Sequence, residues 1–449
     1  MRKFVTVFLA VALLSTLSLA NGLNLNSLGS RALAMGGAFV GLADDFSAIY
    51  WNPAGLASFK TKSFGFYGTD IIPSGTYKLV IPSFVPPPYP TGTVVDAQTK
   101  SKHYLGGMAV YIHPITENVV GAIGIYTPSG LGSDWPSQDL SFLSYPYQST
   151  TIEWKSKIGL ITICPSLAVK VNDMLSLGAS VNVNYGMFDI SMWAGKTLLP
   201  PAYTTEFDLG QYEESETGWG LGATVGLLFR PHQLFSLGAT FRTASTIKFN
   251  GEANISNLVA IGQPGSSEME RNVTWPEWLA VGAAFFPMEN LTFTADIQYT
   301  HWKRIETIKT DYINSIWKLL MTTSGKDTMP MYWQNATQIR FGAEYKANES
   351  LAFRAGYYID PSPAPDKTMN ILLPNYDFNV LTFGLGYNLN GLQIDLGFEY
   401  LMGKERSIDF AKTLNSPLNP FYNKEFEDAM PGTYNMKIIV PNISISYRF

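Results

Sequence analysis

Four histidines and one cysteine are the first residues of this chain to test for nucleophilic, general-base or metal-ligand chemistry. A catalytic histidine works beside a serine, cysteine or carboxylate in a recognisable motif, and none of the four, His103, His113, His232 and His301, has such a motif. Metal-ligand spacing and phosphate-binding glycine loops are also missing from the sequence. Cys164 has no second cysteine with which to form a disulfide. The sequence therefore predicts no enzyme, no metal site and no other cofactor.

Two arginines could bind a charged ligand. Arg340 and Arg354 fall on the polar face of alternating segments, and a guanidinium away from water can pair with a carboxylate. Glu344 and Asp395 fall on the same kind of face, so pairing of the arginines with these acids is the alternative interpretation. We name Arg340 and Arg354 as possible partners of a ligand carboxylate.

The segments that carry these arginines alternate strictly between apolar and polar residues. Every second residue is apolar from Leu291 to Tyr299 and from Leu392 to Tyr400, a period typical of β-strands. Further runs with this period are Leu175–Met187, Ile339–Tyr345, Leu351–Tyr357 and Ile443–Phe449. Charge is confined to one face of the runs, where the charged residues are Asp296, Arg340, Glu344, Arg354, Asp395 and Glu399.

Strand length separates two structures that would produce this pattern, a β-sandwich and a membrane barrel. The runs extend over roughly nine to thirteen residues, near the length of a strand that crosses a bilayer, whereas sandwich strands typically have about five or six. Six short polar turns alternate with seven long connections, at residues 74–101, 128–150, 194–217, 251–271, 306–333, 360–377 and 403–434. The sequence predicts an all-β membrane protein, a 14-stranded antiparallel transmembrane β-barrel with both termini on the short-turn side.

The two ends of the chain have features of an exported barrel precursor. Arg2 and Lys3 precede a short apolar run that ends in small residues, so residues 1–20 are predicted to be a signal peptide. The last strand alternates to a terminal Phe449, which resembles the signal that the outer-membrane assembly machinery reads. We expect a bacterial outer-membrane protein that contacts lipid, lipopolysaccharide and, through Phe449, this machinery.

Composition agrees with a barrel and excludes one class of partner. Only 15% of the residues are charged, against about 25% in ordinary globular proteins. The net charge of −5 offers no basic surface, so no nucleic-acid partner is expected.

Residues 21–59 precede the barrel and do not scan as strands. They are rich in small residues and contain the turn-forming run Asn52-Pro53-Ala54-Gly55. A barrel of this width leaves interior space that side chains alone would not fill. We predict that residues 21–59 form a small plug, or hatch, in the lumen of a barrel that comprises residues 60–449.

The sequence resembles a known family, the FadL-type outer-membrane transporters of long-chain fatty acids, which include toluene and xylene uptake porins. The resemblance covers essentially the whole mature chain, and its most specific part is the hatch. The hatch runs that carry it are Asn21-Gly22-Leu23, Gly29-Ser30-Arg31-Ala32, Ala43-Asp44-Asp45 and Asn52-Pro53-Ala54. The barrel runs that carry it are Trp275-Pro276-Glu277-Trp278, Tyr299-Thr300-His301-Trp302, Phe353-Arg354-Ala355-Gly356 and Asp360-Pro361-Ser362-Pro363-Ala364-Pro365 with Leu373-Pro374.

The resemblance implies passive uptake of hydrophobic compounds through a plugged barrel, with no energy-coupling protein. Two departures from the family, Phe378 in place of an arginine and a short connection at residues 194–217, leave room for a neutral hydrocarbon. Ligand-binding or gate residues expected in the hatch are Asn21, Leu23, Arg31, Phe46, Tyr50, Trp51, Asn52 and Pro53.

The same resemblance implies a lateral exit at a kink of the third strand. Here that strand is predicted at residues 119–126, followed by Thr127-Pro128-Ser129-Gly130, and a proline interrupts ladder pairing. The residues expected at the kink are Tyr126, Pro128 and Gly130. An ordinary loop start is the alternative interpretation of this run.

Apolar side chains in two long connections suggest a capture groove for the ligand. Residues 311–321 place them at helical spacing. The residues expected in the groove are Ile255, Leu258, Val259, Ile316, Trp317 and Leu320. A lid of packed helices is the alternative interpretation of these side chains.

Two alternatives remain for the function as a whole. The protein could be a structural or adhesive barrel with a static hatch, or a porin for aromatic hydrocarbons.

Overall fold

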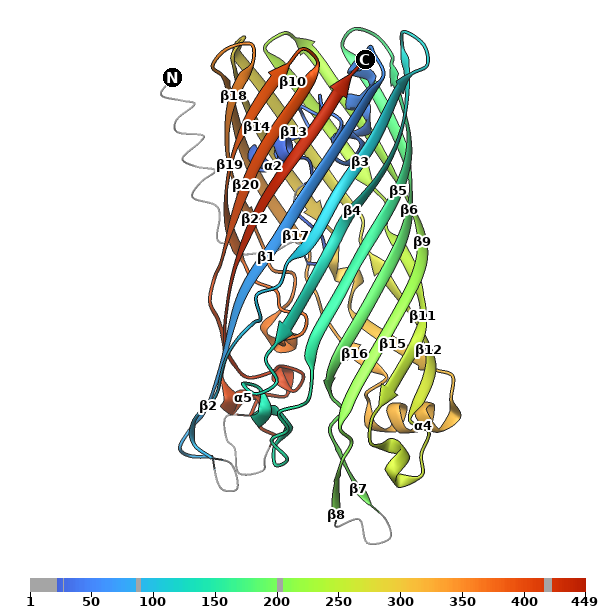
Figure 1. Cartoon of the computed structure of the whole chain (residues 1–449), viewed down its shortest axis with the longest axis vertical. Helices are drawn as coiled ribbons and strands as arrows, with labels where there is room; N and C mark the ends of the chain where they lie inside the picture. The colour runs from blue at the N-terminus through green and yellow to red at the C-terminus, as the bar shows by residue number, and fades with distance from the viewer. Residues whose placement is uncertain (1–21, 27, 86–89, 200–204, 416–421) are drawn as a thin grey trace.

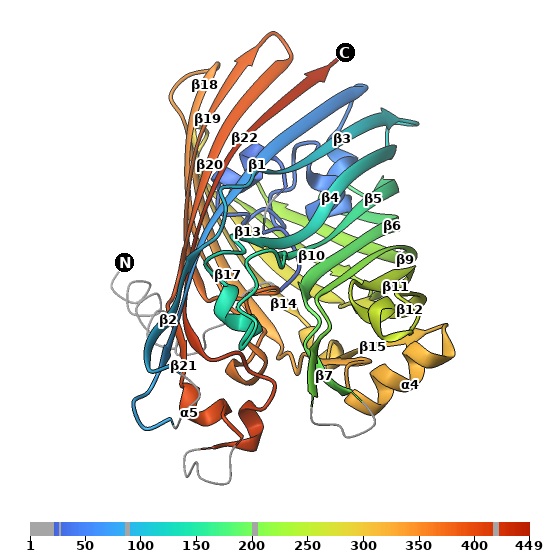
Figure 2. The ribbon, with the colours of Figure 1, turned by 60° about the horizontal axis from the view of Figure 1, so that its bottom comes forward.

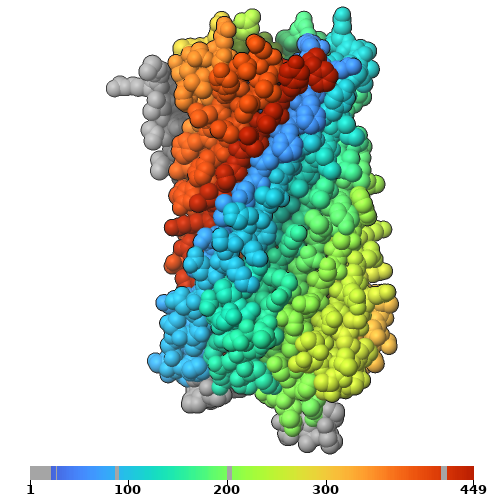
Figure 3. All heavy atoms as spheres, viewed as in Figure 1, coloured from blue at the N-terminus to red at the C-terminus, as the bar shows by residue number. Residues whose placement is uncertain are grey.

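The computed structural model describes residues 22–26, 28–85, 90–199, 205–415 and 422–449. Within these residues, fourteen antiparallel strands form a closed barrel. The ring closes where the first strand, β1 (Ser63–Ile81), pairs with the last, β22 (Gly432–Arg448), in a register from Ser63 opposite Arg448 to Lys78 opposite Thr433. Figure 3 shows these two strands side by side across the outer face, and Figure 1 shows the tilt of all strands to the long axis. The fold class predicted from the sequence is confirmed.

Between β1 and β22, the ring consists of β3 (Tyr104–Pro114), β4 (Val119–Trp135), β5 (Trp154–Lys170), β6 (Leu175–Trp193), β9 (Gln211–His232), β10 (Phe235–Arg242), β13 (Trp278–Met288), β14 (Leu291–Thr300), β17 (Ala336–Lys346), β18 (Leu351–Asp360), β19 (Phe378–Leu389) and β20 (Leu392–Gly403). Shorter strands extend the wall or lie in its connections: β2 (Gly92–Gln98), β7 (Lys196–Leu199), β8 (Thr205–Asp208), β11 (Ser245–Ile255), β12 (Ser266–Trp275), β15 (Thr307–Tyr312), β16 (Thr328–Pro330) and β21 (Arg406–Ile408).

The two faces of the strands meet different surroundings, as the alternation predicts. All six charged residues assigned to the polar face, Asp296, Arg340, Glu344, Arg354, Asp395 and Glu399, are buried inside the barrel. Outward residues at the middle of the strands are large, apolar and exposed, and examples are Phe66, Ile125, Leu221, Val281 and Leu396. Side chains of this kind suit contact with lipid, because burying apolar area in hydrocarbon removes it from water.

The connections divide the barrel into two unequal ends. Six short turns lie at one end, which we call the turn end and which also holds the C-terminus, and seven long connections lie at the other, the loop end (Figure 1). This alternation agrees with the sequence prediction. None of the helices in the described part of the chain is long and apolar enough to cross a membrane.

Several boundaries differ from those expected. β1 continues to Ile81, into the connection predicted at residues 74–101, and β9 begins at Gln211, within the one predicted at residues 194–217. The third strand does not end at Tyr126 but continues to Trp135, because the proline is absorbed in a bulge rather than ending the ladder. Much of the connection predicted at residues 251–271 is strand, since β11 and β12 continue the wall beyond the barrel. The helical spacing at residues 311–321 corresponds to a later helix, α4 (Ser315–Ser324), capped by the Asn314 side chain.

The described residues of the range 22–59, which we call the N-terminal segment, lie within the ring of strands (Figure 2). The segment contains α2 (Ser30–Ala34), α3 (Ala48–Trp51) and the 3₁₀ helix η1 (Pro53–Ser58). Most of its residues are buried against inward side chains of the barrel. Small helices η2 (Ser141–Ser144), η3 (Leu258–Ile261), η4 (Trp302–Arg304), η5 (Asp366–Thr368), α5 (Phe410–Thr413) and η6 (Lys424–Phe426) lie in the long connections.

Candidate functional site: a cavity in the lumen

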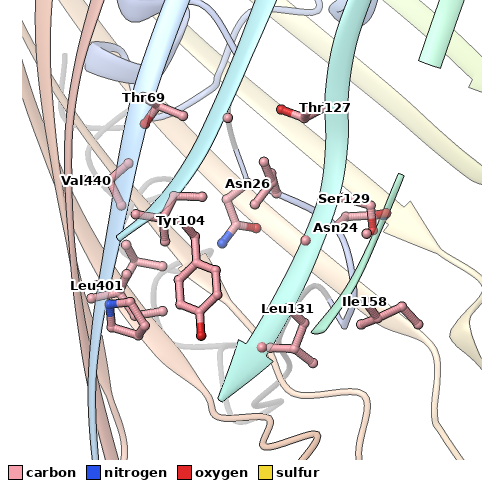
Figure 4. A pocket seen from close by; sticks show the side chains of 18 of the residues that line it. Asn24, Asn26, Thr69, Tyr104, Thr127, Ser129, Leu131, Ile158, Leu401 and Val440 are labelled. Carbon is pink, nitrogen blue, oxygen red and sulfur yellow. The ribbon is translucent and has the colours of Figure 1, made fainter. Parts of the chain in front are cut away.

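A cavity of about 310 Å³ lies inside the barrel on the loop-end side of the N-terminal segment. Its walls come from inward residues of β1, β20 and β22, from the start of the N-terminal segment, and from β4 and β5. The connection after β18 closes it toward the loop end with Pro374, Asn375 and Tyr376. The walls are mainly apolar and include Ile71 and Met436. Figure 4 labels four further apolar members, Leu131, Ile158, Leu401 and Val440. The free energy of an apolar molecule falls when it moves from water into such a space.

The connection that roofs the cavity is fixed by hydrogen bonds to the wall. Ser133 Oγ donates to the Ile371 carbonyl at 2.9 Å, and Trp135 Nε1 donates to the same carbonyl at 3.0 Å. Ser156 Oγ donates to the Leu372 carbonyl. These donors replace water at carbonyls that a buried connection would otherwise leave unpaired.

One side of the cavity lies at an irregularity of β4. Tyr126 pairs with Thr162 of β5 and Ser129 pairs with Leu160, so three steps along β4 correspond to two along β5. The extra residue is a β-bulge at Thr127 and Pro128. On the opposite edge, β4 pairs with β3 only between Val120 and Tyr126, and the pairing ends where the bulge begins.

The start of the N-terminal segment occupies part of the edge that β3 leaves. Asn24 forms an isolated bridge with Ser129. The Leu25 amide donates to the Pro128 carbonyl at 3.0 Å, and the Gly130 amide donates to the Leu23 carbonyl at 3.1 Å. The third-strand residues expected at a kink therefore lie at a true interruption of the ladder, against Leu23 and its neighbours.

Two carboxylates line the cavity. Asp360 accepts hydrogen bonds from Asn26 Nδ2 at 2.6 Å and Gln338 Nε2 at 2.7 Å. Glu399 accepts one from the Tyr358 hydroxyl. In the described part of the wall, Lys157 is the single cationic side chain, and it projects from the outward face of β5. The inner part of the cavity is therefore apolar with acidic groups.

Arg31 and Arg354 hold a buried ion network that ties the N-terminal segment to the barrel. Arg31 Nε donates to Glu344 Oε2 at 2.7 Å, and Arg31 Nη1 pairs with Asp44. Arg354 donates to the same Glu344 oxygen at 2.6 Å and to Asp395 Oδ1 at 2.7 Å. Both arginines of this network bind acids of the protein rather than point into the cavity.

Arg340, the other arginine named from the sequence, contacts the N-terminal segment and two aromatic rings. Its Nη1 donates to the Gly36 carbonyl at 3.0 Å. Its guanidinium carbon lies 5.5 Å from the centroid of the Trp51 ring and 4.5 Å from that of Tyr358. Arg340 is absent from the described lining of the cavity.

The remaining residues expected in the hatch anchor the N-terminal segment near the turn end. Asn52 Nδ2 donates to the Val40 and Leu227 carbonyls, each at 2.9 Å. Trp51 Nε1 donates to the Leu28 carbonyl at 2.9 Å, and the Tyr50 ring packs edge-on at 5.6 Å from that of Tyr126. Phe46 and Pro53 are buried as well. Asn21 lies outside the described residues.

The apolar residues expected in a capture groove divide into two sets. Ile255, Leu258 and Trp317 are buried, and pack α4 and η3 against the extended wall. Val259, Ile316 and Leu320 are exposed. Ile313, which belongs to the same helical pattern, and Leu319, which the sequence analysis did not select, are exposed as well.

Most residues of the cavity wall were not selected from the sequence. Asn24, Asn26 and Tyr104 carry no motif, and they meet only because the N-terminal segment lies beside the β3–β4 break. A signal existed for Glu399, whose place on the polar face predicts that it points into the lumen.

Comparison with known proteins places this arrangement in a family. Residues 11–449 match the model for "Outer membrane protein transport protein (OMPP1/FadL/TodX)". The chain is 22% identical to Outer membrane protein P1 of Haemophilus influenzae, over 92% of this chain and 93% of that protein. It is also 22% identical to the long-chain fatty acid transport protein of Salmonella typhi, over 89% and 92%.

A solved structure has the same fold. The toluene transporter TbuX of Ralstonia pickettii superposes with a TM-score of 0.68 at 17% identity, over 95% of this chain and 99% of that chain. Because the family model matches nearly the whole sequence, the chain belongs to the OMPP1/FadL/TodX family of outer-membrane transport proteins.

Proposed function

We propose that this integral outer-membrane protein passively carries hydrophobic compounds, and that the lumenal cavity is where they bind. The observation that carries the proposal is a mainly apolar cavity that adjoins an interruption of the barrel wall. The proposal is supported by relatives named as transporters of long-chain fatty acids and of toluene. In the proposed orientation, the loop end faces outward and both termini are periplasmic. No enzymatic step is needed for such transport.

Neutral apolar molecules fit the cavity better than carboxylates. A ligand carboxylate in the inner part would approach Asp360 and Glu399, and like charges repel strongly away from water. Arg31 and Arg354 already neutralise acids of the barrel. Aromatic or aliphatic hydrocarbons are therefore the proposed main ligands. Fatty acids are the second candidate, favoured by Lys157 at the outward side and by the relatives named as fatty acid transport proteins.

The N-terminal segment is proposed to act as the hatch of the channel, with residues 21–59 as the hatch and 60–449 as the barrel. Its buried contacts from Arg31 to Asn52 fix it in place. Its first residues, by contrast, pair with the irregular edge of β4. We expect the ligand to pass between this edge and β3 into the membrane, so that the hatch need not leave the lumen.

Folding into the membrane is proposed to begin with recognition of the C-terminus by the assembly machinery. Phe449 is 58% exposed, and its ring stacks 5.9 Å from that of Tyr447 on the outer face. Deleting Phe449 should lower the amount of assembled barrel in the outer membrane. Unchanged assembly would contradict this part of the proposal.

Deletion of Pro128 tests the lateral route. The deletion removes the one extra residue of β4, so regular pairing can continue from Tyr126 to Ser129 and along β3. We expect uptake of labelled naphthalene by a Gram-negative host that lacks its own family members to fall at least fivefold. Pro128→Ala, which keeps the extra residue, is the matched control and should retain uptake. Full uptake by the folded deletion variant would exclude the lateral route, and no uptake by the unaltered protein would contradict the proposed function.

A further inference from the structure

The interruption beside β4 has edges made of very small residues. Residues Tyr104 to Gly106 of β3 pair with β1 but have no ladder partner on β4, and Gly107 bonds to β4 only through the Thr127 side chain. Gly106 on one edge, and Gly130 and Gly132 on the other, line the cavity and have no side chain to fill the space between the strands. Any obstruction there must come from a neighbouring residue.

Two side chains lie there. Leu25 would be 3.7 Å from a Cβ on Gly106 and 3.8 Å from one on Gly130, and Tyr104 stands beside Gly132. A Cβ atom placed on Gly132 would lie 3.3 Å from Cε1 and 3.5 Å from the hydroxyl of Tyr104. The ring therefore extends from the start of β3 to the backbone of β4. Figure 4 shows it standing between Leu401 on one wall of the cavity and Leu131 on the other.

The ring also separates two hollows. One is the lumenal cavity, and the other is a polar groove of about 550 Å³ beside it, lined by Lys102, Asp134, Lys155 and Glu213 among others. Tyr104 lines both hollows. Outward residues such as Lys155 and Glu213 place the groove on the outer face of the wall. The Tyr104 ring thus lies where a molecule would cross from the inside of the barrel to the outside.

Packing alone fixes this ring. In the described part of the chain, the hydroxyl of Tyr104 forms no hydrogen bond, whereas the buried hydroxyls of Tyr77 and Tyr434 donate to carbonyls. A side chain without such a bond can change rotamer at low cost.

We propose that Tyr104 sets the width of molecules that pass through the lateral opening, and so is a specificity-determining residue of transport. This inference rests on the proposed function. Flat or unbranched hydrocarbons pass beside the ring after a small rotation, while bulky cage-like hydrocarbons do not. Removal of the ring widens the opening, because Gly132 opposite the ring has no side chain to take its place.

Uptake of two labelled hydrocarbons by the same host cells tests the inference. Naphthalene is the flat probe and adamantane is the bulky one. We expect Tyr104→Ala to raise adamantane uptake at least fivefold and to change naphthalene uptake less than twofold. Tyr104→Phe should behave as the unaltered protein, because the hydroxyl has no partner, and Tyr104→Trp should lower uptake of both probes.

Tyr111→Ala is the matched control, since Tyr111 is an aromatic residue of β3 in its fully paired part and points outward. It should change neither probe. If Tyr104→Ala does not assemble, the Tyr104→Trp and Tyr104→Phe variants still decide the question. If the assembled Tyr104→Ala and Tyr104→Trp variants take up both probes at the rate of the unaltered protein, the inference is overturned but the proposed function stays intact. Absence of naphthalene uptake by the unaltered protein would overturn both.

Discussion

Arg31 of the N-terminal segment lies with its Nε 2.7 Å from Oε2 of Glu344 on β17, and the two side chains are only 11% and 1% exposed. The same carboxylate accepts a second hydrogen bond from Arg354 at 2.6 Å. Buried charges are costly unless they are paired. This relationship therefore fixes the position of the N-terminal segment in the lumen more strongly than an exposed pair could.

Replacing Arg31 should destabilise the protein far more than replacing an arginine in an exposed pair. Arg31→Met leaves Asp44 without its guanidinium partner and removes one partner of Glu344, so we expect a loss of about 3–5 kcal/mol in the free energy of unfolding. Arg304→Met is the control, because Arg304 pairs with Glu277 but is 45% exposed, and should cost less than about 1 kcal/mol. Urea unfolding in lipid vesicles, followed by tryptophan fluorescence, measures both. Equal losses would contradict the anchoring role.

The N-terminal segment lies so close to the barrel wall that adding a methyl group to a wall glycine should destabilise the protein. A Cβ on Gly238 would lie 2.0 Å from the Val40 carbonyl oxygen, so Gly238→Ala must displace the segment and should cost roughly 1–3 kcal/mol. Gly222→Ala is the matched control, because its nearest neighbour would be Thr243 Oγ1 at 3.4 Å. Thermal unfolding judged by heat-modified migration on gels should shift for Gly238→Ala alone.

The acidic groups of the cavity predict how the channel treats fatty acids. In the double variant Asp360→Asn and Glu399→Gln, decanoate uptake at pH 7 should rise by roughly three- to tenfold, equivalent to about 1 kcal/mol, while naphthalene uptake stays the same. Glu349→Gln, an exposed substitution in the turn before β18, is the control. A decanoate uptake that does not rise would mean that these carboxylates do not select against anions.

A pH effect is expected at Glu277, which lies between β12 and β13. The Arg304 guanidinium donates to this carboxylate, and together with His301 Nδ1 at 2.8 Å holds its pKa at about 2, below the ordinary value. A lowered pKa stabilises the fold at neutral pH, and this contribution is lost as the pH falls through about 2. The ¹³C shift of the carboxyl carbon should titrate there, and Arg304→Met should move the midpoint toward the ordinary value. A midpoint that does not move would show that Arg304 is not the cause.

The sequence alone determined the barrel and its polarity. In the runs with a strict period of two residues, the pattern distinguishes the lumen from the outer face, so Asp296, Arg340 and Glu399 could be placed inside from the sequence. Six short turns alternating with seven long connections gave the number of strands, because every connection joins two successive strands. These features are local, and local patterns can be read along the chain.

The cavity was decided by the tertiary structure. Whether Pro128 ends a strand or bulges within it depends on pairing with β5 and on hydrogen bonds from residues about a hundred positions earlier. Likewise, Arg31 and Arg354 could have faced a ligand, and only the packing of the N-terminal segment brings Asp44, Glu344 and Asp395 to them. Contacts between distant segments have no period in the sequence, which is why the wall was predictable and the site within it was not.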